Sequence, residues 1–173
     1  MIPHKRVSAE VVYSTVAVTK VDRAAIAWLK ELAMENPRKR VRLCAHADTS
    51  DILHEMLIVH AKGAYVRPHR HPGKSESFHL IEGSLSVFIL DEDGVVTERI
   101  DMAADDPAKP FFYRLSQPLY HTVVPTSDLV VFHETTNGPF HREETIFGPW
   151  SPTDDAPAQE CDAFIIKLMG EAW

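Results

Sequence analysis

The stretch that decides the fold runs from residue 63 to residue 83 and reads GAYVRPHRHPGKSESFHLIEG. His69 and His71 are two positions apart, and in an extended strand such side chains point to the same face. A Pro-Gly turn follows them, and Glu76 then opens the next strand. That turn can carry the carboxylate back to the two imidazoles, and this set of ligands suits a divalent transition metal. The stretch therefore predicts a metal site built within β-structure.

Composition and charge are those of one ordinary folded domain. The chain has 173 residues, of which 45% are hydrophobic and 25% charged, and this length suits one domain with its own core. The formal net charge of −7 argues against nucleic-acid binding, because no net positive field exists to displace phosphate counterions. Residues 38–42, RKRVR, are the basic exception. We interpret them as a solvated strand face, with an anchor for an anionic substrate such as a phosphorylated sugar as the alternative.

Cysteine usage and hydropathy indicate the compartment. Cys44 and Cys161 lie far apart and form no CxxC pair, which suits a reducing compartment. The sequence begins with no charged-then-apolar leader and contains no apolar run near the length of a membrane span. We therefore expect a cytoplasmic protein that contacts no membrane.

Strand and helix patterns predict a mainly β domain with helices near its ends. Residues 11–18 are rich in β-branched residues, which favours a strand, and residues 21–35 show the apolar spacing of a helix. The sequence Asn36-Pro37 ends that helix, because the residue before proline is pushed out of the helical region. In all, roughly eight short strands are separated by turns, which is typical of an antiparallel sandwich or barrel. Residues 158–170 predict a short C-terminal helix.

All parts are assigned to one domain. Residues 1–38 form an N-terminal strand and helix that pack on or extend the barrel, and residues 39–135 form the barrel core with the metal site. Residues 136–173 form an irregular segment and the C-terminal helix. Residues 134–140 are interpreted as a packing segment, with a lid over the site as the alternative.

The opening stretch resembles the first sequence motif of the cupin superfamily. Gly63, His69, His71, Glu76 and Gly83 stand at its fixed positions without a gap. The resemblance implies a double-stranded β-helix, or jelly roll, which agrees with the strand pattern. It also implies that the two histidines and the glutamate bind a metal together with one histidine from a second motif.

The second cupin motif is matched at its histidine alone. Its other positions hold residues foreign to the family pattern, namely Pro110, Ser116, Pro118 and Pro125. We take His121 as the fourth ligand, because it begins a strand after a proline-bearing turn at the expected distance from the first motif. His133, on the following strand, is the alternative.

Beyond the superfamily, the chain resembles the WbuC-type cupin-fold metalloproteins. The resemblance lies in residues 37–44, 66–78, 121–125 and 132–140. Such proteins are associated with bacterial surface-polysaccharide gene clusters, which implies a small-molecule substrate such as a sugar or sugar nucleotide. Because cupins commonly pair, the resemblance also implies a homodimer.

Three further residues near the ligands are candidates for substrate binding. Arg67 and Lys74 flank the ligands, and we weigh a substrate anchor against a solvated rim charge. Tyr120 is weighed as an acid near the metal against a buried tyrosine with a satisfied hydroxyl. His79 has the wrong strand parity for ligation, which predicts a rim or structural role.

Three neutral imidazoles and one carboxylate leave a dication with open positions for a substrate. The ligand set suits Fe, Mn, Ni, Co or Zn without choosing among them. The first hypothesis is a metalloenzyme of surface-polysaccharide biosynthesis, such as an isomerase or epimerase. The alternatives are a metal-dependent dioxygenase and a non-catalytic small-molecule-binding or regulatory cupin. An acid or base positioned beside the metal would favour an enzyme.

Overall fold

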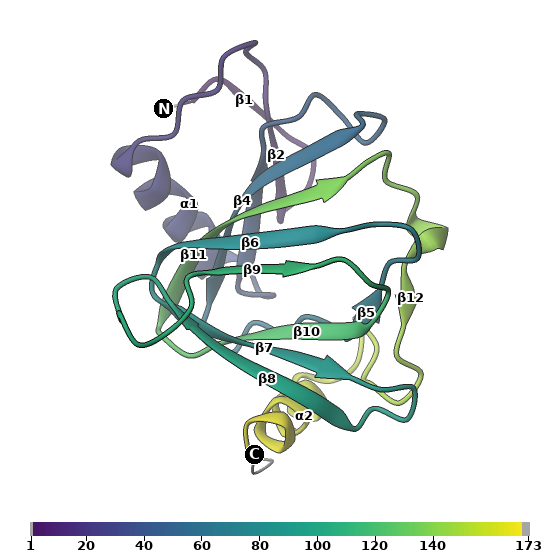
Figure 1. Ribbon diagram of the computed structural model, residues 1–173. Helices are drawn as coiled ribbons and strands as arrows, with labels where there is room; N and C mark the ends of the chain where they lie inside the picture. Colours follow the sequence, from purple (N-terminus) through teal and green to yellow (C-terminus); the bar gives the residue numbers. More distant parts are fainter. Residues whose placement is uncertain (1, 171–173) are drawn as a thin grey trace.

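The computed structural model describes residues 2–170, which form two β-sheets and two α-helices (Figure 1). The strands are β1 (His4–Arg6), β2 (Val11–Ser14), β3 (Arg40–Cys44), β4 (Leu53–Ala61), β5 (His69–Arg70), β6 (Glu76–Glu82), β7 (Ser84–Leu90), β8 (Val96–Ala103), β9 (Phe112–Leu115), β10 (Tyr120–Pro125), β11 (Leu129–Asn137) and β12 (Ile146–Phe147). The helices are α1 (Arg23–Glu35) and α2 (Ala158–Gly170), with a single 3-10 turn, η1, at Arg142–Glu144.

The two sheets form the jelly roll that the sequence predicts. The larger sheet has the strand order β1-β2-β3-β4-β11-β6-β9, and the smaller has the order β12-β5-β10-β7-β8. Within the described chain, β2 pairs with β3 in parallel and the other pairs are antiparallel. The inner faces of the sheets share one apolar core, in which Phe78, Leu85 and Phe132 are buried. The mainly β fold class is therefore confirmed.

Helix α1 is capped at its N-terminus by Asp22 and covers the outer face of the larger sheet. The Asp22 carboxylate accepts a hydrogen bond from the Ala25 N–H at 2.8 Å, which satisfies one of the free donors of the first turn. Ala25, Leu29 and Ala33 face inward at helical spacing. They pack on alternate residues of β3 and β4, in a second apolar cluster that includes Val41, Leu43, Leu57 and Val59.

Helix α2 occupies the range predicted for it and packs at the other end of the molecule, beneath β7 and β8 (Figure 1). Its Leu168 joins Phe88, Leu90 and Val124 in a third apolar cluster on the outer face of the smaller sheet. Neither helix of residues 2–170 combines the length and the apolar character needed to cross a membrane.

The basic run of β3 differs from its prediction as a solvated face. Val41 and Leu43 face α1, so that Arg40 and Arg42 face the space between the sheets and line its cavity. The side chain of Arg40 is only 19% exposed and its Nε donates to Glu10 at 2.8 Å, whereas Arg42 is exposed. Because a helix covers the outer face of β3, the polar residues of this strand are left for the inner face.

The barrel is also longer than the predicted core. Strand β11 continues to Asn137, and β12 lies within the segment expected to be irregular. At the other end, β1 and β2 extend the edge of the larger sheet. Strands two or three residues long give too short a pattern to be separated from loops in the sequence.

Candidate metal centre

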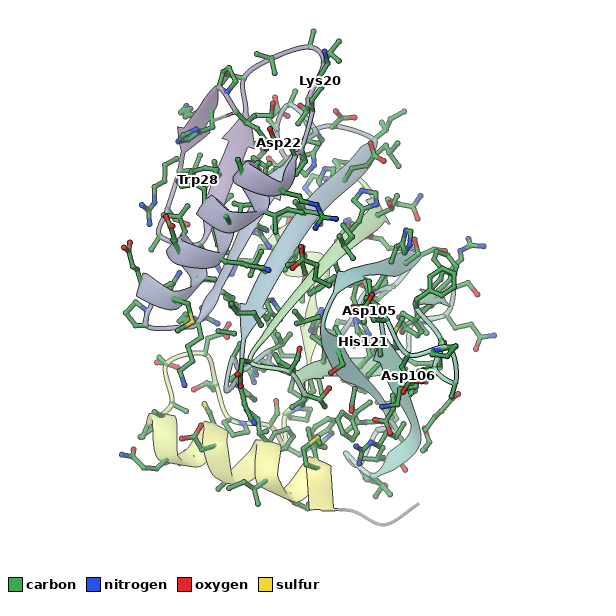
Figure 2. The ribbon with its side chains drawn as sticks, turned by 90° about the vertical axis from the view of Figure 1, so that its left-hand side faces the viewer. Lys20, Asp22, Trp28, Asp105, Asp106 and His121 are labelled. Atoms are coloured by element: carbon green, nitrogen blue, oxygen red, sulfur yellow. The ribbon has the colours of Figure 1, made fainter. Side chains whose placement is uncertain are left out.

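Three histidines converge in the barrel interior. His69 lies in β5, His121 lies in β10, and His71 lies in the turn directly after β5. Strand β10 pairs with β5 so that His121 stands directly opposite His69. The ring of His69 lies 4.6 Å from that of His121 and 4.8 Å from that of His71, measured between centroids. One potential ligand atom from each of the three lies within 4.8 Å of the others. Figure 2 shows His121 among the strands, well separated from Asp22 at the start of α1.

Glu76 reaches this group from the larger sheet. The turn after His71 contains Gly73, whose φ of +76° is a conformation that favours glycine. The chain then reverses, and Glu76 opens β6. Its Oε1 lies 2.9 Å from Nε2 of His121, and both side chains are buried. The structure thus brings together the four residues predicted as ligands, with Glu76 joined to the three imidazoles through His121.

Backbone carbonyls fix the tautomers of two of these imidazoles. Nδ1 of His69 lies 2.8 Å from the carbonyl oxygen of Arg67, and Nδ1 of His121 lies 3.0 Å from that of Leu119. A carbonyl oxygen can only accept, so each Nδ1 carries the proton and each Nε2 of the neutral ring presents a lone pair. Nδ1 of His71 lies 3.4 Å from the Thr145 hydroxyl. Such an arrangement, with one ring nitrogen held and the other free, is that of metal-ligating histidines.

The contact between His121 and Glu76 tests whether these residues fit a cation. Their atoms are 2.9 Å apart, yet within the described chain neither Nε2 nor Oε1 makes a hydrogen bond of acceptable direction. A lone pair facing a carboxylate oxygen at this distance is repulsive unless a proton or a cation lies between or beside them. Two buried acceptors without a donor are costly, and a metal ion satisfies both. The residues fit the group.

Electrostatics keep His69 and His71 neutral and Glu76 ionised, while His121 is drawn towards its protonated form. Burial lowers the pKa of His69 to about 3, and burial likewise lowers the pKa of His71. Burial alone would raise the pKa of Glu76, but the neighbouring imidazoles, His121 first, outweigh it and lower this pKa to about 2. Burial lowers the pKa of His121, and the attraction of Glu76 outweighs that effect, so the net pKa is raised. His69, His71 and Glu76 thus have the protonation states that metal ligands require, whereas a metal must displace a proton from His121.

The metal group lies in the wall of a cavity of about 400 Å³ between the sheets. This volume lies within the range of pockets for small molecules. Arg67 and Lys74, both candidates for substrate binding, line the cavity. Nζ of Lys74 donates to the carbonyl oxygen of Pro139 at 2.6 Å and lies 3.5 Å from Glu144. Lys74 therefore already has partners within the protein, and it ties the turn of the site to the segment after β11.

Other candidates are placed away from the cavity. Tyr120 lies on the opposite face of β10 from His121, in the cluster that packs against α2, where its ring contacts Trp150 and the Arg70 guanidinium. The structure therefore does not bring Tyr120 to the metal group. His133 lies on the outer face of β11, 3.8 Å from Glu55, and does not join the group either. His79 is exposed beside Phe111, as its strand parity predicts.

Glu134 is a functional candidate that sequence reasoning did not single out. It is half-buried and lines the cavity on the inner face of β11, opposite Phe78 of β6. Burial, and then the charge of Glu76, raise the pKa of Glu134 to about 8. The available signal was the alternation of β11, in which Phe132 and Glu134 face inward while His133 faces outward. A carboxyl group that holds its proton near neutral pH suits general acid or base chemistry.

The comparisons with known proteins leave function open. Residues 21–102 match a family model described as a domain of unknown function, DUF6016. No curated protein matches the chain.

Solved structures with a similar fold include protein SO0799 from Shewanella oneidensis, with a TM-score of 0.48 and 11% identity over 60% of this chain and 66% of that one. Another is oxalate decarboxylase from Bacillus subtilis, a protein with Mn(II) centres, with a TM-score of 0.44 and 19% identity over 56% of this chain and 24% of that one. A third is the cupin domain of Cnp3 from Schizosaccharomyces pombe, with a TM-score of 0.44 and 12% identity over 57% of this chain and 64% of that one. The chain thus spans about a quarter of the oxalate decarboxylase, and these similarities assign no activity to it.

Proposed function

We propose that this chain is a cupin metalloprotein that binds one divalent transition metal through His69, His71, His121 and Glu76. The observation that carries the proposal is the convergence of one ligand atom from each of three imidazoles within 4.8 Å of the others, beside a buried carboxylate oxygen that has no hydrogen-bond donor among residues 2–170. A set of nitrogen ligands with one carboxylate suits Fe, Mn, Ni, Co or Zn.

We further propose that the protein is an enzyme for a small polar substrate. When bound, the metal supplies Lewis-acid polarisation of a substrate oxygen, or a redox centre if it is iron or manganese. Glu134 supports an enzyme over a binding module, because it adds a carboxyl group able to hold a proton within the same cavity. Met56, Ile58 and Phe132 also line the cavity, and their apolar side chains limit the access of water.

The finer assignment follows the resemblance to WbuC-type proteins. We propose that the substrate is a sugar or sugar nucleotide of surface-polysaccharide biosynthesis and that the reaction is isomerisation or epimerisation. We also propose that the protein is cytoplasmic and forms a homodimer. Dioxygenation is the runner-up reaction.

The test begins with elemental analysis of protein purified without added metal and without a histidine tag. We expect one transition metal per chain in the wild type, and loss of that metal with retention of the fold in His69→Ala and Glu76→Ala. Candidate sugars are then incubated with the loaded protein and followed by NMR, with oxygen uptake recorded in parallel.

Glu134 provides the decisive comparison between enzyme and binding module. Glu134→Gln keeps the size of the side chain and removes its acid–base function, so we expect full metal content with turnover lowered about a hundredfold or more. Thr135→Ser, its neighbour on β11, is the matched control and is expected to turn over normally. Full turnover by Glu134→Gln would refute the role of this carboxyl group, and a metal-free wild type would refute the function itself.

A further inference from the structure

Cationic side chains gather in the cavity of a protein that is acidic overall. The chain has a net charge of −7, whereas six of the side chains that line the cavity are Arg38, Arg40, Arg42, Arg67, Lys74 and Arg142. Cations in a partly enclosed, low-dielectric space attract anions more strongly than the same charges do in water.

Three of these cations are already neutralised within the protein. Arg38 and Arg40 both lie within 3.3 Å of Glu10, and Arg38 also contacts Asp154 at 2.5 Å. Lys74 is shared between Glu144 and a backbone carbonyl. These three residues therefore leave little charge for a ligand.

Arg67 differs from them, because it is held in place without being neutralised. Its Nε donates to the Ser151 hydroxyl at 3.3 Å, and that buried hydroxyl donates to the carbonyl of Gly148 at 2.7 Å. The guanidinium carbon lies 4.7 Å from the centre of the Phe147 ring. Among residues 2–170, no carboxylate lies within 4.0 Å of Arg67 and its two Nη groups make no hydrogen bond. A guanidinium fixed at Nε and by its stacking face presents the two-pronged edge that binds carboxylate or phosphate.

The position of Arg67 places this edge beside the metal group. Phe147 of β12 pairs with His69 of β5, and their ring centres are 6.2 Å apart. Arg67 also precedes His69 by two residues, and its carbonyl fixes the His69 tautomer. On the facing sheet, Arg42 lines the same cavity, and no described carboxylate lies within 4.0 Å of it. Both walls therefore contribute positive charge to the cavity that the metal ligands also line.

We propose that the ligand of this cavity is an anionic small molecule, and that Arg67 binds its carboxylate or phosphate group while a neighbouring oxygen of the ligand faces the metal group. This inference rests on the proposed function for the site and adds the chemical class of its ligand. A neutral sugar would leave the charge of Arg67 without a partner in a partly buried site, which is unfavourable.

The test is calorimetric titration of the protein with matched probes, namely glucose, glucose 6-phosphate, glucuronate and inorganic phosphate. Each is titrated into the metal-loaded and the metal-stripped protein, and metal content is measured on the same samples. We expect at least one anionic probe to bind the wild type more tightly than glucose does, with an affinity that falls as salt is added.

The variants identify the residue responsible. We expect Arg67→Gln to bind the anionic probes at least about tenfold more weakly, the loss typical of one charge-assisted hydrogen-bonded pair, with metal content unchanged. Arg67→Lys keeps the positive charge but lacks the two Nη groups of the guanidinium. We expect its affinity for the anionic probes to lie between those of the wild type and Arg67→Gln. Arg114→Gln, on an exposed residue of β9, is the matched control and is expected to bind as the wild type does.

The two proposals fail in different ways. If the wild type holds its metal but binds no anionic probe, or if Arg67→Gln binds anions as tightly as the wild type, the anionic ligand is refuted and the metal site stands. If the wild type holds no metal and Arg67 still governs anion binding in the stripped protein, the metal function fails and the anion site stands.

Discussion

His121 and Glu76 meet across the two sheets of the barrel, with Nε2 of the imidazole 2.9 Å from Oε1 of the carboxylate. Each comes from a different sheet, so their contact joins the two layers at the metal group. Because the Nδ1 proton of His121 is committed to the carbonyl of Leu119, the contact is favourable only when Nε2 carries a proton or a cation lies beside it. A metal ion therefore competes with one proton at this position.

The first prediction concerns the pH dependence of metal affinity. Attraction by Glu76 raises the pKa of His121. When the pH lies below that pKa, a proton must leave this imidazole before a metal can bind. Below that pKa we expect the affinity to fall by about tenfold for each unit of pH. Zinc titrations of the stripped protein at pH 5.5, 6.5 and 7.5, in buffers of different ionisation enthalpy, measure both affinity and proton release. An affinity independent of pH over this range would contradict the competition.

The second prediction compares two glycines with the same backbone conformation. Gly73 and Gly83 both have φ of +76°, so alanine at either position carries the left-handed cost of about 1–2 kcal/mol. A Cβ at Gly73 would meet nothing within 4 Å, whereas one at Gly83 would lie 2.3 Å from the carbonyl oxygen of Leu129. We expect Gly83→Ala to lower the free energy of unfolding by at least about 2 kcal/mol more than Gly73→Ala does. Urea unfolding of the two variants measures the difference, and equal losses would contradict the close approach at the β6–β7 turn.

The third prediction concerns a buried histidine outside the metal group. His60 is 6% exposed, its Nδ1 finds no partner in the described chain, and burial, helped by Arg40 and Arg42, lowers its pKa to about 3. An unfolded histidine has a pKa of about 6.5, so between these values unfolding takes up a proton and the stability from this residue is lost as the pH falls.

From pH 7 to pH 5 we expect His60 to account for about 2 kcal/mol of lost unfolding free energy. Urea unfolding of metal-stripped protein at both pH values measures the loss, which His60→Leu should reduce by that amount. His79→Leu, on an exposed residue of β6, is the control and should leave the loss as it is in the wild type. A loss of the same size in His60→Leu and the wild type would show that His60 is not held neutral.

Spacing along the sequence predicted the parts of the site that lie close together in the chain. The two-residue interval of His69 and His71, and the turn that returns Glu76, depend on local geometry alone. The fourth predicted ligand needed more, because His121 and His133 both lie on strands. Their pairing settles where each one points: His121 is opposite His69, and His133 is opposite His79 on an outer face.

Residues whose orientation depends on what covers a strand were not predictable in this way. Arg40 has the alternating pattern of a solvated face, yet α1 packs on the other side of β3 and leaves the arginine inside. Glu134 was considered as part of a packing segment. Alternation along the strand places it on the same face as Phe132, but nothing in the sequence shows that this strand lies between β4 and β6. Register and layer order decide these two cases, and the local pattern does not show them. Tyr120 is different, because alternation along the strand is enough to place it on the face opposite His121.

The metal site of His69, His71, His121 and Glu76 is tested most sharply by a Co(II) titration of the metal-stripped protein followed by visible absorption. We expect one equivalent bound in the wild type and in His133→Ala, whose imidazole lies on the outer face of β11. We expect no binding at this site in His121→Ala, provided that circular dichroism shows the fold to be retained. Equal Co(II) binding by folded His121→Ala and the wild type would contradict the assignment of this site.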